Sequence, residues 1–322
     1  MHPVTQRRIV LAIVGLVVAL SAVQVTEAQV AAGAALEVAA APGDNYDKAE
    51  FRLWYQPDAG LLRAVVVLAP GSNGDGRSMV DDPVWRDLAT RHHLALVGCR
   101  FTDKPHEQGF IEHYAEARRG SGQALLDALV AWAGRSTHPE LAGLPLLMWG
   151  MSAGGQFNYE FVAWQPDRVA AFVVNKGGIY YTALVPQAAR NVPGLLFTGG
   201  KDLEFRTNTI VGLFAVNRRA GALWALADEP GAAHVVGRSR DMAVIFFEDV
   251  LALRLGGSSP GAAAPGGLAA LSEKGGFIGD LHVKTFEAAG ESAVPSGPTA
   301  WLPTVRVARA WQALVTEKPF ER

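Results

Sequence analysis

Solid apolar runs alternate along this chain with longer stretches whose apolar residues recur at helical spacing. Six runs are almost wholly apolar, which is typical of strands buried on both faces of a parallel sheet. An earlier segment, 51–55, alternates apolar and polar residues as an outer strand does. Strands that alternate with helices predict an α/β fold, a mostly parallel sheet with helices on both faces. The six runs are 64–69, 94–99, 144–149, 170–174, 194–198 and 222–226, and the predicted helices are 82–92, 113–135, 156–164, 207–219 and 238–255.

The alternation of strands and helices stops near residue 255. Residues 256–267 read GGSSPGAAAPGG, a composition that predicts a linker. The remaining residues, 268–322, contain one clear helix, 305–315, and we expect this C-terminal extension to pack on the core, because roughly 55 residues bury little surface alone. One α/β domain is therefore expected over 29–255, with an alanine-rich, loosely held lead-in at 29–41.

Residues 1–28 predict a secretory signal peptide. Arg7 and Arg8 precede an uncharged apolar stretch from Ile9 to Leu20, and Thr-Glu-Ala at 26–28 offers small residues at the positions that a signal peptidase reads. Because apolar character continues to Val25, a retained N-terminal membrane anchor is the alternative. The expected location is secreted or periplasmic, with no stable membrane insertion after removal of the signal.

Composition excludes some classes of function. Hydrophobic residues make up 49% of the 322 residues and charged residues 19%, which suits a large core and not a disordered chain. The formal net charge of −2 and the lack of a long basic run argue against a nucleic-acid partner. The single cysteine, Cys99, ends an apolar run and is expected to be a buried small hydrophobe.

The strongest chemical signal is the pentapeptide Gly-Met-Ser-Ala-Gly at 150–154. It matches G-x-S-x-G, follows the apolar run 144–149 and precedes a helix-compatible stretch. A strand, a tight turn that carries a serine, and a helix form the context of a nucleophile elbow. Ser152 is therefore the predicted nucleophile, with its hydroxyl at a helix N-terminus, where developing negative charge is favoured.

A serine nucleophile needs a base within hydrogen-bond reach and a third group that orients the base. In this architecture the chain order is serine, acid, histidine. His234 lies in a glycine-bearing loop after the last strand, where the base belongs, and Asp202 follows the 194–198 strand through a glycine turn. The predicted triad is Ser152, Asp202 and His234; the alternatives are His282 as the base and Glu204 or Asp228 as the acid.

Acyl transfer also requires two backbone donors where the oxyanion forms. One is expected to be the amide of Ala153, directly after the nucleophile. The other is expected from the loop after the 64–69 strand, Pro-Gly-Ser-Asn-Gly, and is assigned to Ser72 with Asn73 as the alternative.

From about Phe51 to Leu255 the chain resembles the α/β-hydrolase superfamily. The resemblance is carried by Gly-Met-Ser-Ala-Gly-Gly at 150–155, by Thr-Gly-Gly-Lys-Asp at 198–202, and by His234. The chain looks most like secreted bacterial esterases, the group that includes feruloyl esterases and polyhydroxyalkanoate depolymerases. This resemblance implies hydrolysis of small or polymeric carboxylic esters through an acyl-enzyme intermediate.

Two positions depart from that family pattern. Pro70-Gly71 stands where the oxyanion loop often has His-Gly, and Met151 replaces the aromatic residue or histidine often found before the serine. The Pro70-Gly71 departure concerns the second oxyanion donor. The Met151 departure alters the wall of the substrate pocket but not the chemistry.

The predicted pocket is apolar and aromatic, and each of its members could equally be an ordinary core residue. No cofactor and no metal are expected, because the chain has no phosphate loop, metal-ligand cluster or dinucleotide fingerprint. An acyltransferase or peptidase that uses the same triad, and a non-catalytic binding protein of the same fold, stay open as alternatives. The candidate pocket residues are Met151, Phe157, Tyr180, Tyr181 and Trp301.

Overall fold

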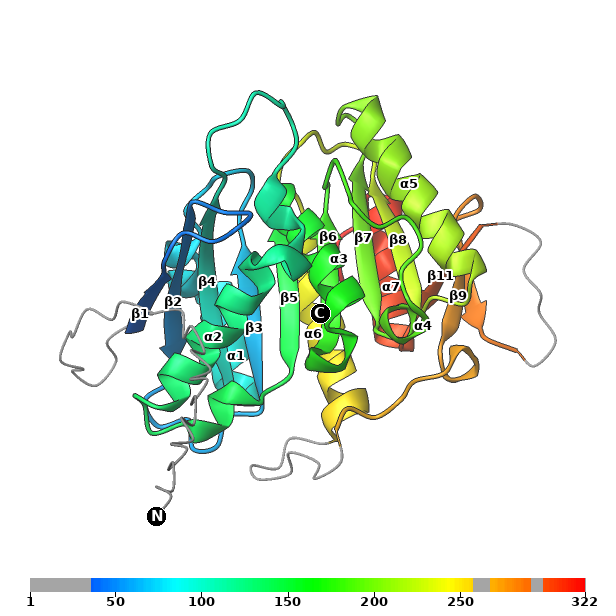
Figure 1. Ribbon diagram of the computed structural model, residues 1–322. Coiled ribbons are helices and arrows are strands. Elements are labelled where there is room, and N and C mark those ends of the chain that lie inside the picture. The colour runs from blue at the N-terminus through cyan, green and yellow to red at the C-terminus, as the bar shows by residue number, and fades with distance from the viewer. Residues whose placement is uncertain (1–35, 257–266, 291–297, 322) are drawn as a thin grey trace, which may run out of the picture.

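The computed structural model describes residues 36–256, 267–290 and 298–321. The predicted signal peptide and the interior of the predicted linker, 257–266, lie outside these residues. The described part of the chain contains an eight-stranded sheet in the order β1-β2-β4-β3-β5-β6-β7-β8, and a three-stranded sheet in the order β10-β9-β11 (Figure 1). The strands of the larger sheet are β1 Leu36–Ala40, β2 Lys48–Tyr55, β3 Ala64–Ala69, β4 Leu94–Thr102, β5 Leu146–Met151, β6 Val169–Asn175, β7 Gly194–Gly199 and β8 Trp224–Glu229.

Strands β3 to β8 run parallel, and β1 and β2 form an antiparallel edge. Helices cover both faces: α2, α3 and α5 lie in front of the sheet in Figure 1, and α1, α6 and α7 lie behind it. This architecture confirms the predicted fold class, the α/β-hydrolase fold. The helices are α1 Pro83–His92, α2 Ser121–Ala133, α3 Ala153–Trp164, α4 Gln187–Arg190, α5 Glu204–Arg219, α6 Ser239–Leu255 and α7 Val305–Val315.

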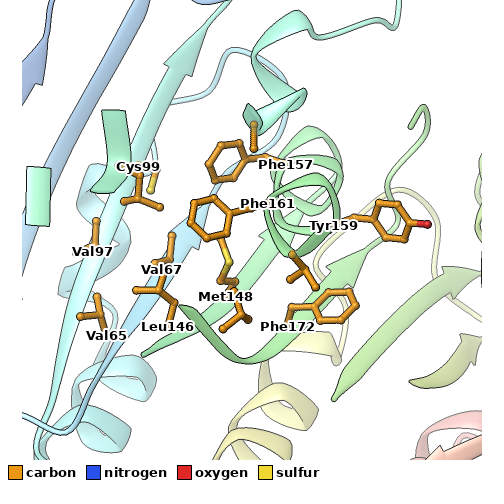
Figure 2. Close-up of a cluster of buried hydrophobic side chains, with 14 of the residues drawn as sticks. Val65, Val67, Val97, Cys99, Leu146, Met148, Phe157, Tyr159, Phe161 and Phe172 are labelled. Atoms are coloured by element: carbon orange, nitrogen blue, oxygen red, sulfur yellow. The ribbon is translucent and has the colours of Figure 1, made fainter. Parts of the chain in front are cut away.

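The central strands bury both of their faces, which explains their continuous apolar sequences. In β3, Val65 and Val67 join the core under α2 and α3, whereas Val66 and Leu68 join the core under α1, α6 and α7. Figure 2 shows the first core, in which strand residues of the sheet face aromatic side chains of α3. Because parallel strands end at the same edge of a sheet, the loops after β5, β7 and β8 are brought together there.

Two segments differ from the sequence-based expectation. Residues 36–40, expected to belong to a loose lead-in, form β1 and pair antiparallel with β2. The helix expected over 113–135 is interrupted, and its regular part begins only at Ser121, after Gly120 with φ 134°. The side chain of Asn45 favours the interruption, because it accepts a hydrogen bond from the Ser121 amide at 3.1 Å and donates one to the Glu116 carbonyl at 3.0 Å.

Residues 268–321 hold the small sheet and α7, and both pack against the larger sheet beside β8 (Figure 1). Trp311 of α7 is fully buried in the core behind the sheet, and its Nε1 donates to the Leu226 carbonyl of β8 at 2.7 Å. The small sheet was not expected from the sequence, because its strands are too short to show a clear alternation. They are β9 Phe277–Asp280, β10 Phe286–Ala288 and β11 Thr299–Leu302.

None of the helices in the described residues combines the length and the apolar character needed to span a bilayer.

Candidate active site

Ser152 lies at the turn between β5 and α3, in a backbone conformation that side chains rarely adopt, with φ 52° and ψ −121°. The two flanking glycines allow this turn to be tight. A Cβ on Gly154 would lie 2.2 Å from the carbonyl oxygen of Ala69, and a Cβ on Gly150 would lie 2.3 Å from the backbone of Gly154. Contacts that short are not tolerated with backbone atoms, so G-x-S-x-G is a steric requirement here.

The side chains of the predicted triad form one hydrogen-bonded chain. His234 Nε2 lies 3.0 Å from Ser152 Oγ, and His234 Nδ1 lies 2.7 Å from Asp202 Oδ2. An ionised carboxylate only accepts, so Nδ1–H donates to Asp202 and leaves the Nε2 lone pair toward the serine hydroxyl. The three residues follow β5, β7 and β8, which shows how the sheet edge brings distant positions of the sequence together.

The carboxyl group of Asp202 is held in its charged form. Its side chain is only 2% exposed, and burial alone would raise its pKa. Hydrogen bonds from His234, from the Leu203 amide at 2.7 Å and from Arg206 at 3.1 Å outweigh burial, so the pKa lies below the usual range for aspartate. Asp202 is therefore an anionic acceptor for the imidazole.

The alternative base and acids lie elsewhere. His282 is exposed in the turn after β9, where its amide donates to Asp280. Glu204 is exposed at the first turn of α5, and Asp228 accepts a hydrogen bond from Thr198 Oγ1 at 2.8 Å. Of the candidate bases and acids, the structure places only His234 and Asp202 in line with the serine.

The loop after β3 lies directly beside the serine, since a Cβ on Gly71 would be 3.6 Å from Ser152 Cβ. The Asn73 amide already donates to Tyr114 Oη at 3.2 Å. Within the described part of the chain, no hydrogen bond uses the amide of Ser72. Ala153 is the first residue of α3, where N–H groups have no partner within the helix. These contacts favour the amides of Ala153 and Ser72 over Asn73 as oxyanion donors.

The candidate pocket residues have mixed positions. Trp301 was predicted wrongly: it is buried in β11 with Leu223 and Ile278, and its Nε1 donates to the Glu273 carbonyl. Leu223 precedes β8, at the end opposite to the loop that carries His234, so Trp301 cannot reach the serine.

Phe157 is a core residue on α3, fully buried against Phe101 (Figure 2). The Tyr180 ring packs on Tyr159 at 5.0 Å with its hydroxyl buried.

Tyr181 is 37% exposed and its hydroxyl donates to the Glu112 carbonyl. Burial is the main cause that raises the pKa of Tyr181 to about 12. The Met151 sulfur accepts from Asn175 Nδ2 at 3.2 Å, directly before the nucleophile. Of these four side chains, Tyr181 and Met151 are therefore the better placed to meet a substrate.

Arg206 and the aromatic side chains around it were not predicted from the sequence. Arg206 pairs with Asp202 at 3.1 Å, and its guanidinium lies over the rings of Phe205 and Phe110, at 5.2 and 5.9 Å from their centroids. The spacing of four residues between Asp202, just before α5, and Arg206, in its first turn, was a usable signal. Phe110 comes from a distant loop, so no local pattern indicated it.

Exposed apolar side chains adjoin the triad, and we name them the apolar rim. Leu203 and Val235 are neighbours of Asp202 and His234 in the chain, and Phe110 and Phe205 contact each other with ring centroids 6.0 Å apart. Phe110 is 65% exposed and has φ 63°, a strained value for a bulky residue. Exposed apolar groups that gather in one place favour a binding role. The apolar rim consists of Phe110, Leu203, Phe205, Val235 and Val236.

The described residues hold no group of three or more histidine, cysteine, aspartate or glutamate side chains arranged for a metal ion. Cys99 is fully buried in the core under α3, and burial raises the pKa of its thiol (Figure 2). A thiol in such a place is inert.

No protein-family model and no curated protein matches this chain. Among solved structures, it is similar to a poly(3-hydroxybutyrate) depolymerase, LpqC, from Bordetella parapertussis. The two are 17% identical, the match covers 71% of this chain and 92% of that chain, and the TM-score is 0.49. This likeness is too distant to carry an argument about the chemistry, which depends on the geometry of Ser152, His234 and Asp202.

Proposed function

We propose that the protein is a serine hydrolase that cleaves carboxylic esters through an acyl-enzyme intermediate. His234 takes the proton of Ser152 as Oγ attacks the ester carbonyl, and Asp202 stabilises the imidazolium that forms. The amides of Ala153 and Ser72 bind the oxyanion of the tetrahedral intermediate. His234 then protonates the leaving alcohol, and a water molecule activated in the same way releases the acid.

The observation that carries the proposal is the unbroken chain from Asp202 through His234 to Ser152, with separations of 2.7 and 3.0 Å. These distances lie within the range required of a nucleophile, its base and the group that orients the base. The strained turn at Ser152 supports the same conclusion, because such strain is concentrated at functional sites.

The apolar rim suggests that the substrate carries an apolar acyl or alcohol group. Arg206, the cation that lies over Phe205 of the rim, is already engaged by Asp202. The resemblance of the sequence to feruloyl esterases and polyhydroxyalkanoate depolymerases makes hydroxycinnamoyl and 3-hydroxyacyl esters the first candidates to assay.

A fluorophosphonate probe tests the chemistry directly. We expect the purified protein to be labelled at Ser152, as shown by mass spectrometry of its peptides, and Ser152→Ala to lose labelling and at least about 1,000-fold in kcat. Ser272→Ala, at an exposed serine in the segment before β9, is the matched control and should behave as the wild type.

Labelling at another residue, or none, would refute the proposal. If amide substrates are cleaved as fast as matched esters, the protein is a peptidase, and if added alcohols capture most of the acyl group, it is an acyltransferase.

We also propose that residues 1–28 direct export to the periplasm or the medium. N-terminal sequencing of the protein from its native host tests this, with Gln29 expected as the first residue. An intact N-terminus in the membrane fraction would favour the anchor instead.

A further inference from the structure

A buried ion pair lies next to the triad and takes no part in the proposed chemistry. Lys176, the residue after β6, is 0% exposed, and its Nζ lies 3.0 Å from Oε2 of Glu229, the last residue of β8. The same ammonium donates to Asn175 Oδ1 at 3.1 Å. Removing two charges from water is costly, and a buried pair often contributes less stability than apolar residues of the same volume would. Stability alone is therefore a weak explanation for this pair.

The pair contacts both ends of the loop that carries His234. Before His234, the backbone carbonyl of Glu229 accepts a hydrogen bond from the Ala232 amide at 3.0 Å. After His234, the side-chain Oε1 of Glu229 accepts one from the Arg238 amide at 2.8 Å. Oε2 of Glu229 lies 2.2 Å from where a Cβ on Gly237 would be, so the chain passes close over the carboxylate there. Loop 230–238 is thus attached to Glu229 on each side of His234.

The other end of the pair is linked to the nucleophile through Asn175, the residue before Lys176. The Asn175 carbonyl accepts from the Ser152 amide at 2.8 Å, and Asn175 Nδ2 donates to the Val236 carbonyl at 3.2 Å. Lys176 follows with φ 56°, a positive value like that of Ser152. A strained residue persists only when its surroundings hold it, and here the bond from Nζ to Glu229 does so. Asn175 and Lys176 therefore connect the elbow to the histidine loop.

We propose that Lys176 and Glu229 are positioning residues, which fix the distance between Ser152 and His234 through the elbow and the histidine loop. The inference rests on the proposed hydrolase function, because it concerns that same site. Neither residue touches the substrate. Loss of the pair should therefore slow the chemical step and leave substrate binding almost unchanged. A misplacement of about 1 Å can cost on the order of 100-fold in rate.

Two variants of Glu229 separate charge from hydrogen bonding. Glu229→Gln keeps the shape and an acceptor for the Arg238 amide, whereas Glu229→Leu removes the acceptor as well. We expect kcat to fall about 10- to 100-fold in Glu229→Leu and less in Glu229→Gln, with KM within about twofold of the wild type in both. The double variant Lys176→Met/Glu229→Gln, which removes both charges and keeps the acceptor, should retain more activity than Lys176→Met alone.

Rates are expressed per active site, counted by the amount of fluorophosphonate bound at completion, so that unfolded molecules do not contribute.

Glu248→Gln is the control, because it removes a well-buried carboxylate between α1, α6 and α7. It should lower the stability of the protein without changing kcat. Equal kcat values in wild type, Glu229→Gln and Glu229→Leu would overturn the positioning role, as would parallel changes in kcat and KM. If Glu229→Leu does not fold, the near-isosteric Glu229→Gln alone decides. A wild type that binds no probe would refute the hydrolase proposal instead.

Discussion

Gly154 illustrates how a single residue type fixes the geometry at the nucleophile. A Cβ at this position would meet the carbonyl oxygens of Ala69 and Pro70, at 2.2 and 2.5 Å, and both belong to the backbone beside the oxyanion loop. Backbone cannot yield as the end of a flexible side chain can. We expect Gly154→Ala to destabilise the fold by roughly 2–4 kcal/mol and to reduce probe labelling of the molecules that remain folded.

Gly212 provides the matched control, since it lies in α5 with open space where its Cβ would be. Gly212→Ala should raise the free energy of unfolding by about 0.5–1 kcal/mol, the ordinary gain in helix propensity. Urea unfolding of the two variants measures both effects. A Gly154→Ala protein as stable as Gly212→Ala would contradict the steric account of the elbow.

Phe110 belongs to the loop after β4, far in the sequence from the other residues of the apolar rim. Its ring contacts the start of α5. If it covers the acyl group of a bound ester, Phe110→Ala should lower kcat/KM for an octanoyl ester about five- to tenfold, or about 1 kcal/mol, and leave an acetyl ester nearly unchanged. Val283→Ala, at an exposed site after β9, is the control and should affect neither. Equal losses with both esters would mean that Phe110 acts through Arg206 and Asp202 and not by binding the acyl group.

At the residue scale, the sequence indicates which side chains meet wherever a rule connects position in the chain to position in the fold. Ser152, Asp202 and His234 each follow a parallel strand, and parallel strands end at one edge of the sheet. The same reasoning failed for Trp301, because its β11 belongs to a second sheet and Trp301 packs on Leu223, before the start of β8. Phe110 was missed because its partners are set by loop packing, which leaves no periodic signal. Lys176 follows β6 and Glu229 ends β8, so the strand rule also applies to this pair, although it was not used.

At the scale of elements, strand boundaries were predicted best where a strand is buried on both faces. The apolar run 64–69 coincides with β3, and the C-terminal helix 305–315 coincides with α7. By contrast, β1 was missed because alanine dominates its neighbourhood and indicates no structure strongly. The interruption before α2 could not be seen locally, since Asn45, which bonds to it, lies 76 residues before Ser121.

Helices α1, α6 and α7 are joined behind the sheet by Glu248 of α6. Its carboxylate accepts hydrogen bonds from Arg91 and from Arg306, and it lies 3.4 Å from His92 Nε2. Burial acts to raise its pKa, but the three partners outweigh burial and lower it to about 2, from an ordinary value of 4.5. The lowered pKa means that this contribution to stability is complete above about pH 4.5 and is lost as pH falls toward about 2.

Glu248→Gln should therefore lower the free energy of unfolding by roughly 1–3 kcal/mol at neutral pH, and the gap to the wild type should narrow below about pH 4.5. Urea unfolding at a series of pH values measures that gap. Glu287→Gln, at an exposed glutamate of β10, should show no such dependence. A gap that stays constant down to pH 3 would contradict the assignment to Glu248.

At the scale of the whole molecule, the sheet separates two cores, and the chain after the predicted linker completes one of them. The core behind the sheet combines residues of β3, α6 and α7 with Ala300 and Leu302 of β11. The triad lies at the ends of strands of the larger sheet. This core covers the back faces of those strands. The described residues after the linker, 268–290 and 298–321, therefore stabilise the strands on which the site depends, although none of them supplies one of its hydrogen-bonded groups.

Trp311 tests whether the C-terminal segment and the sheet unfold as one unit. Trp311→Ala removes a fully buried ring and the donor to the Leu226 carbonyl. We expect it to lower the free energy of unfolding by about 3–5 kcal/mol. Trp311→Phe keeps an aromatic ring and should lower the free energy of unfolding by about 1–3 kcal/mol. Arg309→Ala, exposed on the same helix, should change little. In each variant the melting of the protein and the loss of the proposed esterase activity should coincide. Strand β8 leads into the loop that carries His234, and α7 covers β8. Separate transitions, with activity retained after α7 has melted, would show that the C-terminal segment is an independent appendage.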